Sequence, residues 1–154
     1  DAGENVKVSN EINIDTCLLN HPKGATGYRV NFKGRSVCYV TDTEHKKEGL
    51  DENILKLVED TDLFIYDSTY TEKEYPNFEG WGHSTWQEGV RISKKANVKN
   101  YAIFHHDPSH DDDFMDKVEL EAKEVFSDAF VAKEGMEIDF NGKDIEFGKF
   151  DDKP

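Results

Sequence analysis

Residues 27–43, with the sequence GYRVNFKGRSVCYVTDT, constrain the fold more than any other stretch of this chain. Apolar and polar side chains alternate on both sides of Lys33-Gly34, which is the pattern of two half-buried strands joined by a tight turn. The pattern predicts an antiparallel hairpin with one face against a core. A hairpin of this kind needs a larger sheet, so the rest of the chain has to supply further strands and the elements that cover them.

Strand-like and helix-like runs follow one another in the order of a mixed α/β domain. Ser84 and Gln87 form a capping-box pattern at the start of one helix, and Asn141-Gly142 is a type I′ turn signal between two late strands. The helix-like runs, recognised by their apolar spacing, are residues 50–60, 84–97 and 111–126. The strand-like runs outside the hairpin are residues 6–10, 14–20, 63–69, 100–106, 129–135, 136–140 and 144–148. This order predicts at least one sheet covered by helices.

The 154 residues suit a single domain, which we expect to comprise residues 1–150, with residues 151–154 as a frayed tail. The formal net charge of −14 disfavours generic nucleic-acid binding, because an acidic surface repels phosphate backbones. No apolar run has the length of a membrane span. Cys17 and Cys38 fall in strand-like runs, where buried free thiols indicate the cytoplasm; a disulfide is the alternative.

Polar residues that can bind metals stand where the predicted elements end or begin. His21, Asp42, Asp67 and His105 each follow or end a predicted strand, and His83 precedes a predicted helix. When several strands finish on the same side of a sheet, their terminal side chains converge at one edge. Rigid strands hold ligands there, and loops give access. The sequence therefore predicts a metal site at this edge.

Each of these residues also has a simpler interpretation when it is considered alone. A single histidine at a strand end is commonly a surface or hydrogen-bonded residue, and the histidines would then be incidental to a structural domain. His45 lies among Glu44, Lys46 and Lys47 and is interpreted as a solvated side chain. A calcium loop within residues 107–113 is a further alternative, although its spacing does not fit an EF-hand.

Two longer segments carry a resemblance to a known family. The segment LLNHPKGATGYRVNFKGRSVCYVTDTEH, residues 18–45, resembles the central part of the metallo-β-lactamase superfamily. The segment GWGHSTWQEGVRISKKANVKNYAIFHHDPSH, residues 80–110, resembles its phosphodiesterase branch, which includes ribonuclease Z-like and cyclic-phosphate phosphodiesterase-like enzymes. The similarity runs in order through residues 12–135. It implies part of an αββα sandwich, with a mixed sheet and helices on one face.

The resemblance also implies roles for individual residues. It implies that His21 binds one metal ion, that Asp42 bridges two and that His105 binds the second. The metal would be zinc, with manganese or iron as alternatives, and a metal-bound hydroxide would attack phosphorus. His83 is then the proton donor to the leaving group. The remaining implied roles are phosphate binding by Ser84 and Thr85, and orientation of the ligands by His106, Asp107 and His110.

One part of the family pattern is missing from this chain. The superfamily's main ligand motif, His-x-His-x-Asp-His, lies upstream of the matched region and does not occur here. The chain therefore resembles only the C-terminal half of the fold, and its start at Asp1 without a methionine fits a fragment. There are two alternatives to a fragment: another chain supplies the missing half, or this chain is a non-catalytic descendant of the enzyme family. The half-fold would leave one sheet face uncovered, so a homodimer or pairing with an N-terminal half is expected.

These observations leave two functional hypotheses. The first is a metal-dependent phosphodiesterase for which this chain supplies part of the site, so that the chain alone is a weak hydrolase or inactive. The second is a non-catalytic metal-binding or sensory module of the same fold. The acidic balance favours a small phosphodiester over RNA as the substrate.

Overall fold

The structure is a computed structural model that describes residues 2–140 and 145–149. Its main sheet has seven strands in the order β1-β2-β3-β4-β5-β6-β7. Strands β1 to β4 are antiparallel to their neighbours, and β4 to β7 are parallel. The strands are β1 (Asn5–Lys7), β2 (Ile12–Leu19), β3 (Ala25–Phe32), β4 (Arg35–Val40), β5 (Leu63–Asp67), β6 (Tyr101–Phe104) and β7 (Ala129–Val131). The mixed α/β prediction is confirmed.

The predicted hairpin is strands β3 and β4. Phe32 pairs with Arg35 across the two-residue turn. Lys33 and Gly34 both have positive φ, 50° and 79°, as a type I′ turn requires. The local alternation of side chains was therefore sufficient to predict both strands and the position of the turn.

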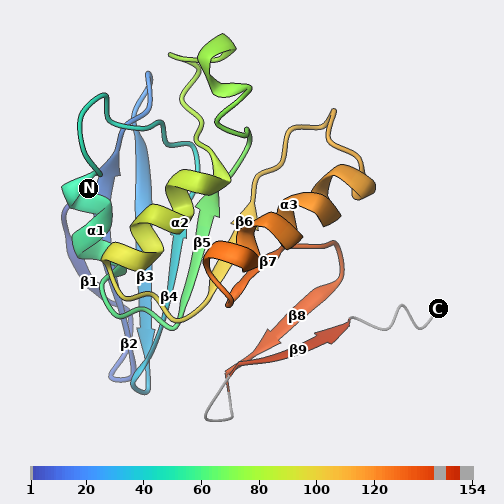
Figure 1. Ribbon diagram of the computed structural model, residues 1–154. Helices are drawn as coiled ribbons and strands as arrows, with labels where there is room; N and C mark the ends of the chain where they lie inside the picture. Colours follow the sequence, from blue (N-terminus) through green and yellow to red (C-terminus); the bar gives the residue numbers. More distant parts are fainter. Residues whose placement is uncertain (1, 141–144, 150–154) are drawn as a thin grey trace.

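Three helices cover one face of the sheet (Figure 1). They are α1 (Glu52–Val58), α2 (Trp86–Lys95) and α3 (Asp112–Val125), and a short 3-10 helix η1 (Tyr75–Asn77) lies in the long loop before α2. Helix α1 packs on β2 and β3, α2 on β5 and β6, and α3 on β7. Between the helices and the sheet lies the main core, in which Phe64, Tyr66 and Tyr101 are the largest fully buried side chains. The resulting strand–helix order places the carboxyl ends of β4, β5 and β6 at one edge.

The start of α2 differs from the prediction by one residue. Thr85, not Ser84, is the N-cap, and its side chain accepts a hydrogen bond from the Glu88 backbone N–H. Ser84 is fully buried, and its hydroxyl lies 2.8 Å from the hydroxyl of the buried Tyr66. A buried Tyr hydroxyl needs a polar partner, and Ser84 meets that need instead of capping the helix.

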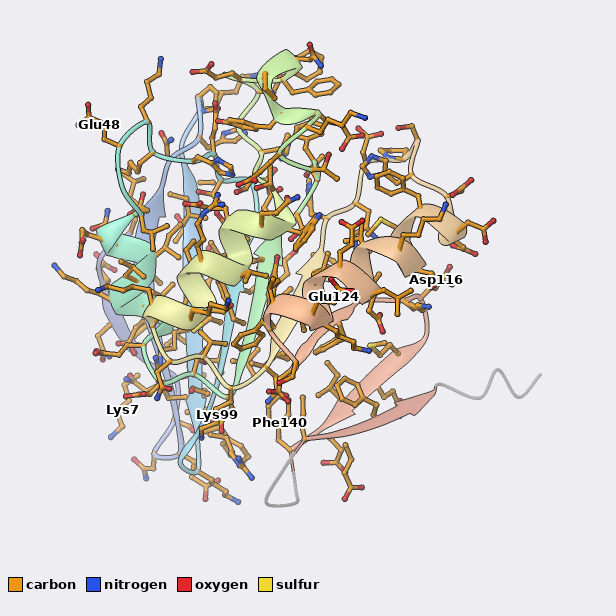
Figure 2. The ribbon with its side chains drawn as sticks, viewed as in Figure 1. Lys7, Glu48, Lys99, Asp116, Glu124 and Phe140 are labelled. Carbon is orange, nitrogen blue, oxygen red and sulfur yellow. The ribbon has the colours of Figure 1, made fainter. Side chains whose placement is uncertain are left out.

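The described residues cover the second face of the sheet only in part. A hairpin of β8 (Met136–Asp139) and β9 (Glu146–Lys149) packs on it, and Phe140, labelled in Figure 2, belongs to the same apolar cluster as Leu63 and Phe130. The predicted turn at Asn141-Gly142 and the predicted tail 151–154 lie outside the described residues. Over β2, β3 and β4 the apolar side chains on this face stay exposed; they are Leu18, Tyr28, Val30, Phe32 and Tyr39. Within the described residues, no helix is long and apolar enough to cross a membrane.

Candidate functional site

Three of the predicted site residues lie together at the carboxyl edge of the sheet. Asp42 follows β4, His105 follows β6, and His83 ends the loop that leads into α2. Each offers a ligand atom, and these atoms lie within 4.8 Å of one another. The predicted convergence at a strand edge therefore holds for these three, and we call them the Asp42–His83–His105 cluster.

Two members of the cluster have an unusual backbone conformation. Asp42 has a φ of 59° and His105 a φ of 65°. Non-glycine residues adopt this left-handed region uncommonly and at an energetic cost, because the Cβ crowds the neighbouring carbonyl. Such strain persists where the surrounding structure fixes it and is concentrated at functional sites. Here it occurs at the first turn after a strand in both cases.

Asp67 is the residue that holds the cluster together. Its carboxylate is fully buried and lies 3.0 Å from Nδ1 of His83, while the backbone N–H groups of Asp42 and Ser84 donate to it at 2.9 and 3.1 Å. One side chain thus connects the end of β4, the end of β5 and the start of α2. The sequence placed Asp67 at a strand end but did not assign it this role.

Thr69 extends the same network to His105. Its hydroxyl lies 2.8 Å from Oδ1 of Asp67 and 3.1 Å from Nδ1 of His105. The Nδ1 atoms of both histidines therefore face Asp67 and Thr69. An imidazole held in this way is the usual arrangement for a histidine whose other nitrogen binds a metal or transfers a proton.

The network shifts the pKa values of its members in opposite directions. The hydrogen bond to Asp67 raises the pKa of His83, although burial works against it. Burial alone would raise the pKa of Asp67, but hydrogen bonds from His83, Ser84 and Thr69 outweigh burial and lower it. The pair therefore favours an ionised carboxylate beside an imidazole that retains its proton to higher pH than usual.

His21, a third histidine at this edge, lies beside the cluster. Its ring centroid is 6.3 Å from that of His83, whose ring stacks on His105 at 5.0 Å. The His21 ring packs directly against the backbone of Gly82, since a Cβ at that position would lie 2.3 Å from the ring. The three rings thus follow one another along the edge.

Glu44 fixes the loop that carries His83. Its carboxylate accepts hydrogen bonds from the backbone N–H of Gly80 at 2.6 Å and of Gly82 at 3.0 Å, and from the Tyr75 hydroxyl at 3.0 Å. His45 stacks on the Tyr75 ring at 4.4 Å and lies 3.2 Å from the Thr85 backbone nitrogen. The interpretation of His45 as a solvated side chain is therefore wrong, because Tyr75, in the loop between β5 and α2, stacks on its ring.

The other predicted residues make their hydrogen bonds elsewhere. Nε2 of His106 lies 2.9 Å from the Ile103 carbonyl oxygen, Asp107 accepts from Ser109, and His110 pairs with Glu74 at 2.9 Å. These contacts fix the loop between β6 and α3. The side chains that contact Nδ1 of His83 and Nδ1 of His105 are Asp67 and Thr69. Neither Ser84 nor Thr85 has an exposed side chain, so their hydroxyls face the interior.

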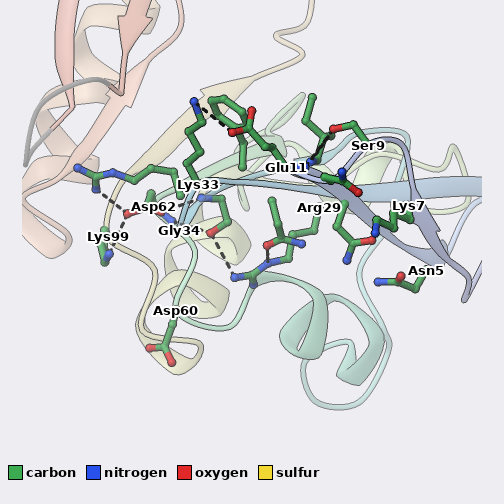
Figure 3. A pocket seen from close by; sticks show the side chains of 17 residues that line it. Asn5, Lys7, Ser9, Glu11, Arg29, Lys33, Gly34, Asp60, Asp62 and Lys99 are labelled. Atoms are coloured by element: carbon green, nitrogen blue, oxygen red, sulfur yellow. Dashed lines mark hydrogen bonds and ion pairs between the residues drawn. The ribbon is translucent and has the colours of Figure 1, made fainter.

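A cavity of about 540 Å³ lies near the opposite edge of the sheet (Figure 3). Arg29, Arg35, Lys99 and Asp62 are among its lining residues. Asp62 accepts hydrogen bonds from Arg35 at 3.0 Å and Lys99 at 2.8 Å, and Arg29 donates to two backbone carbonyls at the end of α1. These charges stabilise the junction of strands and helix there, and the cavity does not include the cluster.

A mixed sheet with helices on one face, and with imidazoles and a carboxylate gathered at its strand ends, is the architecture of the metallo-β-lactamase fold. Residues 3–106 match a family model described as "Beta-lactamase superfamily domain". The chain therefore belongs to the β-lactamase superfamily.

Named relatives point to one group within that family. The chain is 36% identical over 107 residues to ribonuclease Z of Sulfurisphaera tokodaii, covering 69% of this chain and 33% of that protein. It is 31% identical over 110 residues to ribonuclease Z of Picrophilus torridus, covering 71% of this chain and 33% of the relative. The chain thus spans about a third of the length of these relatives.

Solved structures confirm the fold. The metallo-β-lactamase fold protein YhfI from Bacillus subtilis aligns with a TM-score of 0.72 at 21% identity, covering 96% of this chain and 53% of that chain. The short form of human tRNase Z aligns with a TM-score of 0.62 at 18% identity, covering 84% of this chain and 43% of that one.

Proposed function

We propose that this chain supplies part of the active site of a metal-dependent phosphodiesterase. The observation that carries the proposal is the Asp42–His83–His105 cluster, with both imidazoles oriented by Asp67 and Thr69. Residues 1–150 would form the contributing domain, corresponding to the C-terminal half of the fold. Membership of a family with ribonuclease Z relatives supports a reaction at a phosphodiester.

The donor set fits a divalent transition metal. One carboxylate and nearby imidazoles are ligands that zinc accepts, and manganese or iron are alternatives. We propose Asp42, His105 and His21 as ligands, as the family resemblance implies, and leave His83, whose Nδ1 is held by Asp67, for proton transfer. When bound, the cation would supply Lewis-acid stabilisation of negative charge on the phosphate oxygens.

The chain's own contribution to the reaction is a positioned proton. Asp67 accepts the Nδ1–H of His83 and so directs Nε2 away from the carboxylate. His83 is then a candidate general acid that donates from Nε2 to the leaving oxygen, because its hydrogen bond to Asp67 raises its pKa and favours a retained proton. The buried carboxylate fixes the tautomer and stabilises the imidazolium.

Among phosphodiesters, we propose a small substrate over RNA. The net charge of −14 disfavours a polyanion at long range. The name of the ribonuclease Z relatives keeps RNA as the competing substrate. The free, buried thiols of Cys17 and Cys38 support a cytoplasmic location.

The uncovered sheet face supports a further partner for this domain. Leu18, Tyr28, Phe32 and Tyr39 are exposed on one face over β2, β3 and β4. Since contiguous exposed apolar surface marks an interaction site, we propose that an N-terminal half or a second copy covers it. The chain alone would then be a weak hydrolase or inactive. The alternative is a metal-binding module of the same fold without catalysis.

Metal binding tests the proposal. Titration of the metal-free chain with Zn²⁺ or Mn²⁺ should show saturable binding that His105→Ala or Asp42→Asn abolishes. His106→Ala is the matched control, because His106 is adjacent in sequence but contacts the Ile103 carbonyl. Failure of the chain to bind either metal would refute the proposal. Even weak turnover of bis(4-nitrophenyl) phosphate, lost in His83→Ala while metal binding is kept, would favour the enzyme over the module.

A further inference from the structure

A series of aromatic rings leads from the cluster to the surface. The His83 ring contacts Tyr70 edge-on at 6.4 Å, and Tyr70 stacks in parallel on Phe78 at 4.3 Å with 4° between the planes. Phe78 in turn meets Trp81 in a T-shaped contact at 5.5 Å. The series occupies the loop between β5 and α2, and none of its rings except His83 has a role in the chemistry proposed above.

Trp81 is the exposed end of this series. It is 64% exposed, although an indole ring is among the most favourable side chains to bury. The T-shaped contact with Phe78 fixes the plane of the ring without covering both of its faces. Trp81 is also two residues from His83 and adjacent to Gly82, whose backbone packs against the His21 ring, so its exposed ring belongs to the same loop as the candidate site.

The backbone that presents Trp81 is held in place rather than loose. Gly80 and Gly82 flank it with φ values of 89° and 90°, which other residues rarely adopt. Glu44 accepts a hydrogen bond from the backbone N–H of each of these two glycines. A platform fixed in this way loses little conformational entropy when a ligand binds, which favours affinity.

We propose that Trp81, supported by Phe78, is a stacking surface for a planar aromatic group, chemically a nucleobase, joined to a phosphate at the Asp42–His83–His105 cluster. The inference rests on the proposed function, because the phosphate has to lie near His83. The acidic chain is poorly suited to hold a second phosphate, so the organic part of the substrate has to be recognised through uncharged contacts. Stacking of a base on an indole is such a contact and tolerates different bases.

Binding of two probes to the purified chain in the presence of Mn²⁺ tests this inference. Adenosine 5′-monophosphate carries the base, and ribose 5-phosphate offers the same phosphate and sugar without it. We expect adenosine monophosphate to bind more tightly and to quench tryptophan fluorescence. Trp81→Ala should weaken its binding by roughly 5- to 150-fold, since a stacking aromatic contributes about 1–3 kcal/mol per base. Affinity for ribose 5-phosphate and for Mn²⁺ should not change.

Three controls make the outcome decisive. Trp81→Phe keeps a stacking ring and should retain most of the affinity, and its remaining fluorescence comes from the buried Trp86. Leu120→Ala removes a similarly exposed apolar side chain, 67% exposed on α3, and should have no effect. The inference is overturned if adenosine monophosphate does not bind, binds no better than ribose 5-phosphate, or keeps its advantage in Trp81→Ala. The Mn²⁺ titration alone then shows whether the proposed metal site fails as well.

Discussion

Replacing Asp67 by Asn is the most informative single perturbation of this molecule. The amide has nearly the shape of the carboxylate, but one of its two terminal atoms becomes a donor. In the structure both oxygens face donors: Oδ2 accepts from the backbone of Asp42 and lies next to His83, and Oδ1 accepts from the backbone of Ser84. Whichever way the amide turns, at least one of these buried donors loses its acceptor.

The expected cost follows from that count. A buried donor without a partner costs about 1–3 kcal/mol, and a hydrogen bond to a charged group contributes about 1.5–3 kcal/mol. We therefore expect Asp67→Asn to lower the free energy of unfolding by about 3 kcal/mol, or the melting temperature by roughly 6–12 °C for a chain of this size. Because the hydrogen bond to Asp67 is the main cause of the raised pKa of His83, that pKa should fall in the variant.

Urea unfolding and an NMR titration of the His83 ring protons measure the two effects. Asp107→Asn is the matched control, because Asp107 accepts from Ser109 within an exposed turn, and it should cost less than about 1 kcal/mol. If Asp67→Asn unfolds at the same urea concentration as the unmodified chain and leaves the His83 titration unchanged, the assigned role of Asp67 is incorrect.

Three further predictions concern the packing and the charges around the site. Gly82→Ala should displace His21, because the new Cβ would lie 2.3 Å from the His21 ring and because residue 82 has a φ of 90°. Weaker metal binding and a changed His21 NMR signal would show the displacement, and an unchanged signal would contradict it. Gly89→Ala should destabilise the chain by about 1–3 kcal/mol, since its Cβ would lie 2.1 Å from the buried Tyr101 hydroxyl. Urea unfolding measures this cost, and an unaltered unfolding midpoint would contradict the close packing of Gly89 on Tyr101. The raised pKa of His83 should contribute stability that is complete below its unfolded-state pKa and is lost as pH rises through its folded-state pKa. The lowered pKa of Asp67 should contribute stability that is present above its unfolded-state pKa and is lost as pH falls through its folded-state pKa. In unfolding curves measured across pH, His83→Gln should flatten the loss of stability that His83 causes as pH rises.

Local patterns were enough to predict the elements and the edge at which the site lies. The alternation around Lys33-Gly34 is a property of neighbouring residues, and the structure has the hairpin there. Asp42 and His105 meet because β4, β5 and β6 are parallel, so residues just beyond their ends must lie at one edge. The resemblance to the metallo-β-lactamase superfamily is confirmed by the family match.

Contacts between loops that are distant in the sequence could not be predicted from local patterns. His45 and Tyr75 are 30 positions apart, and nothing local indicates that their rings stack. Asp67 receives donors from three separate segments, so its role depends on the folded arrangement alone. At the start of α2 the sequence offers Ser84 and Thr85 in succession, and only the buried hydroxyl of Tyr66 decides which of them caps the helix.

The left-handed backbone at Asp42 and His105 means that this chain sacrifices some of its own durability at the site. Glycine adopts this backbone conformation without strain, so Asp42→Gly and His105→Gly should have higher melting temperatures than Asp42→Ala and His105→Ala. All four variants lose the side chains that would hold a cation. Selection for thermostable variants of this protein would therefore favour glycine at positions 42 and 105, and it would remove the site.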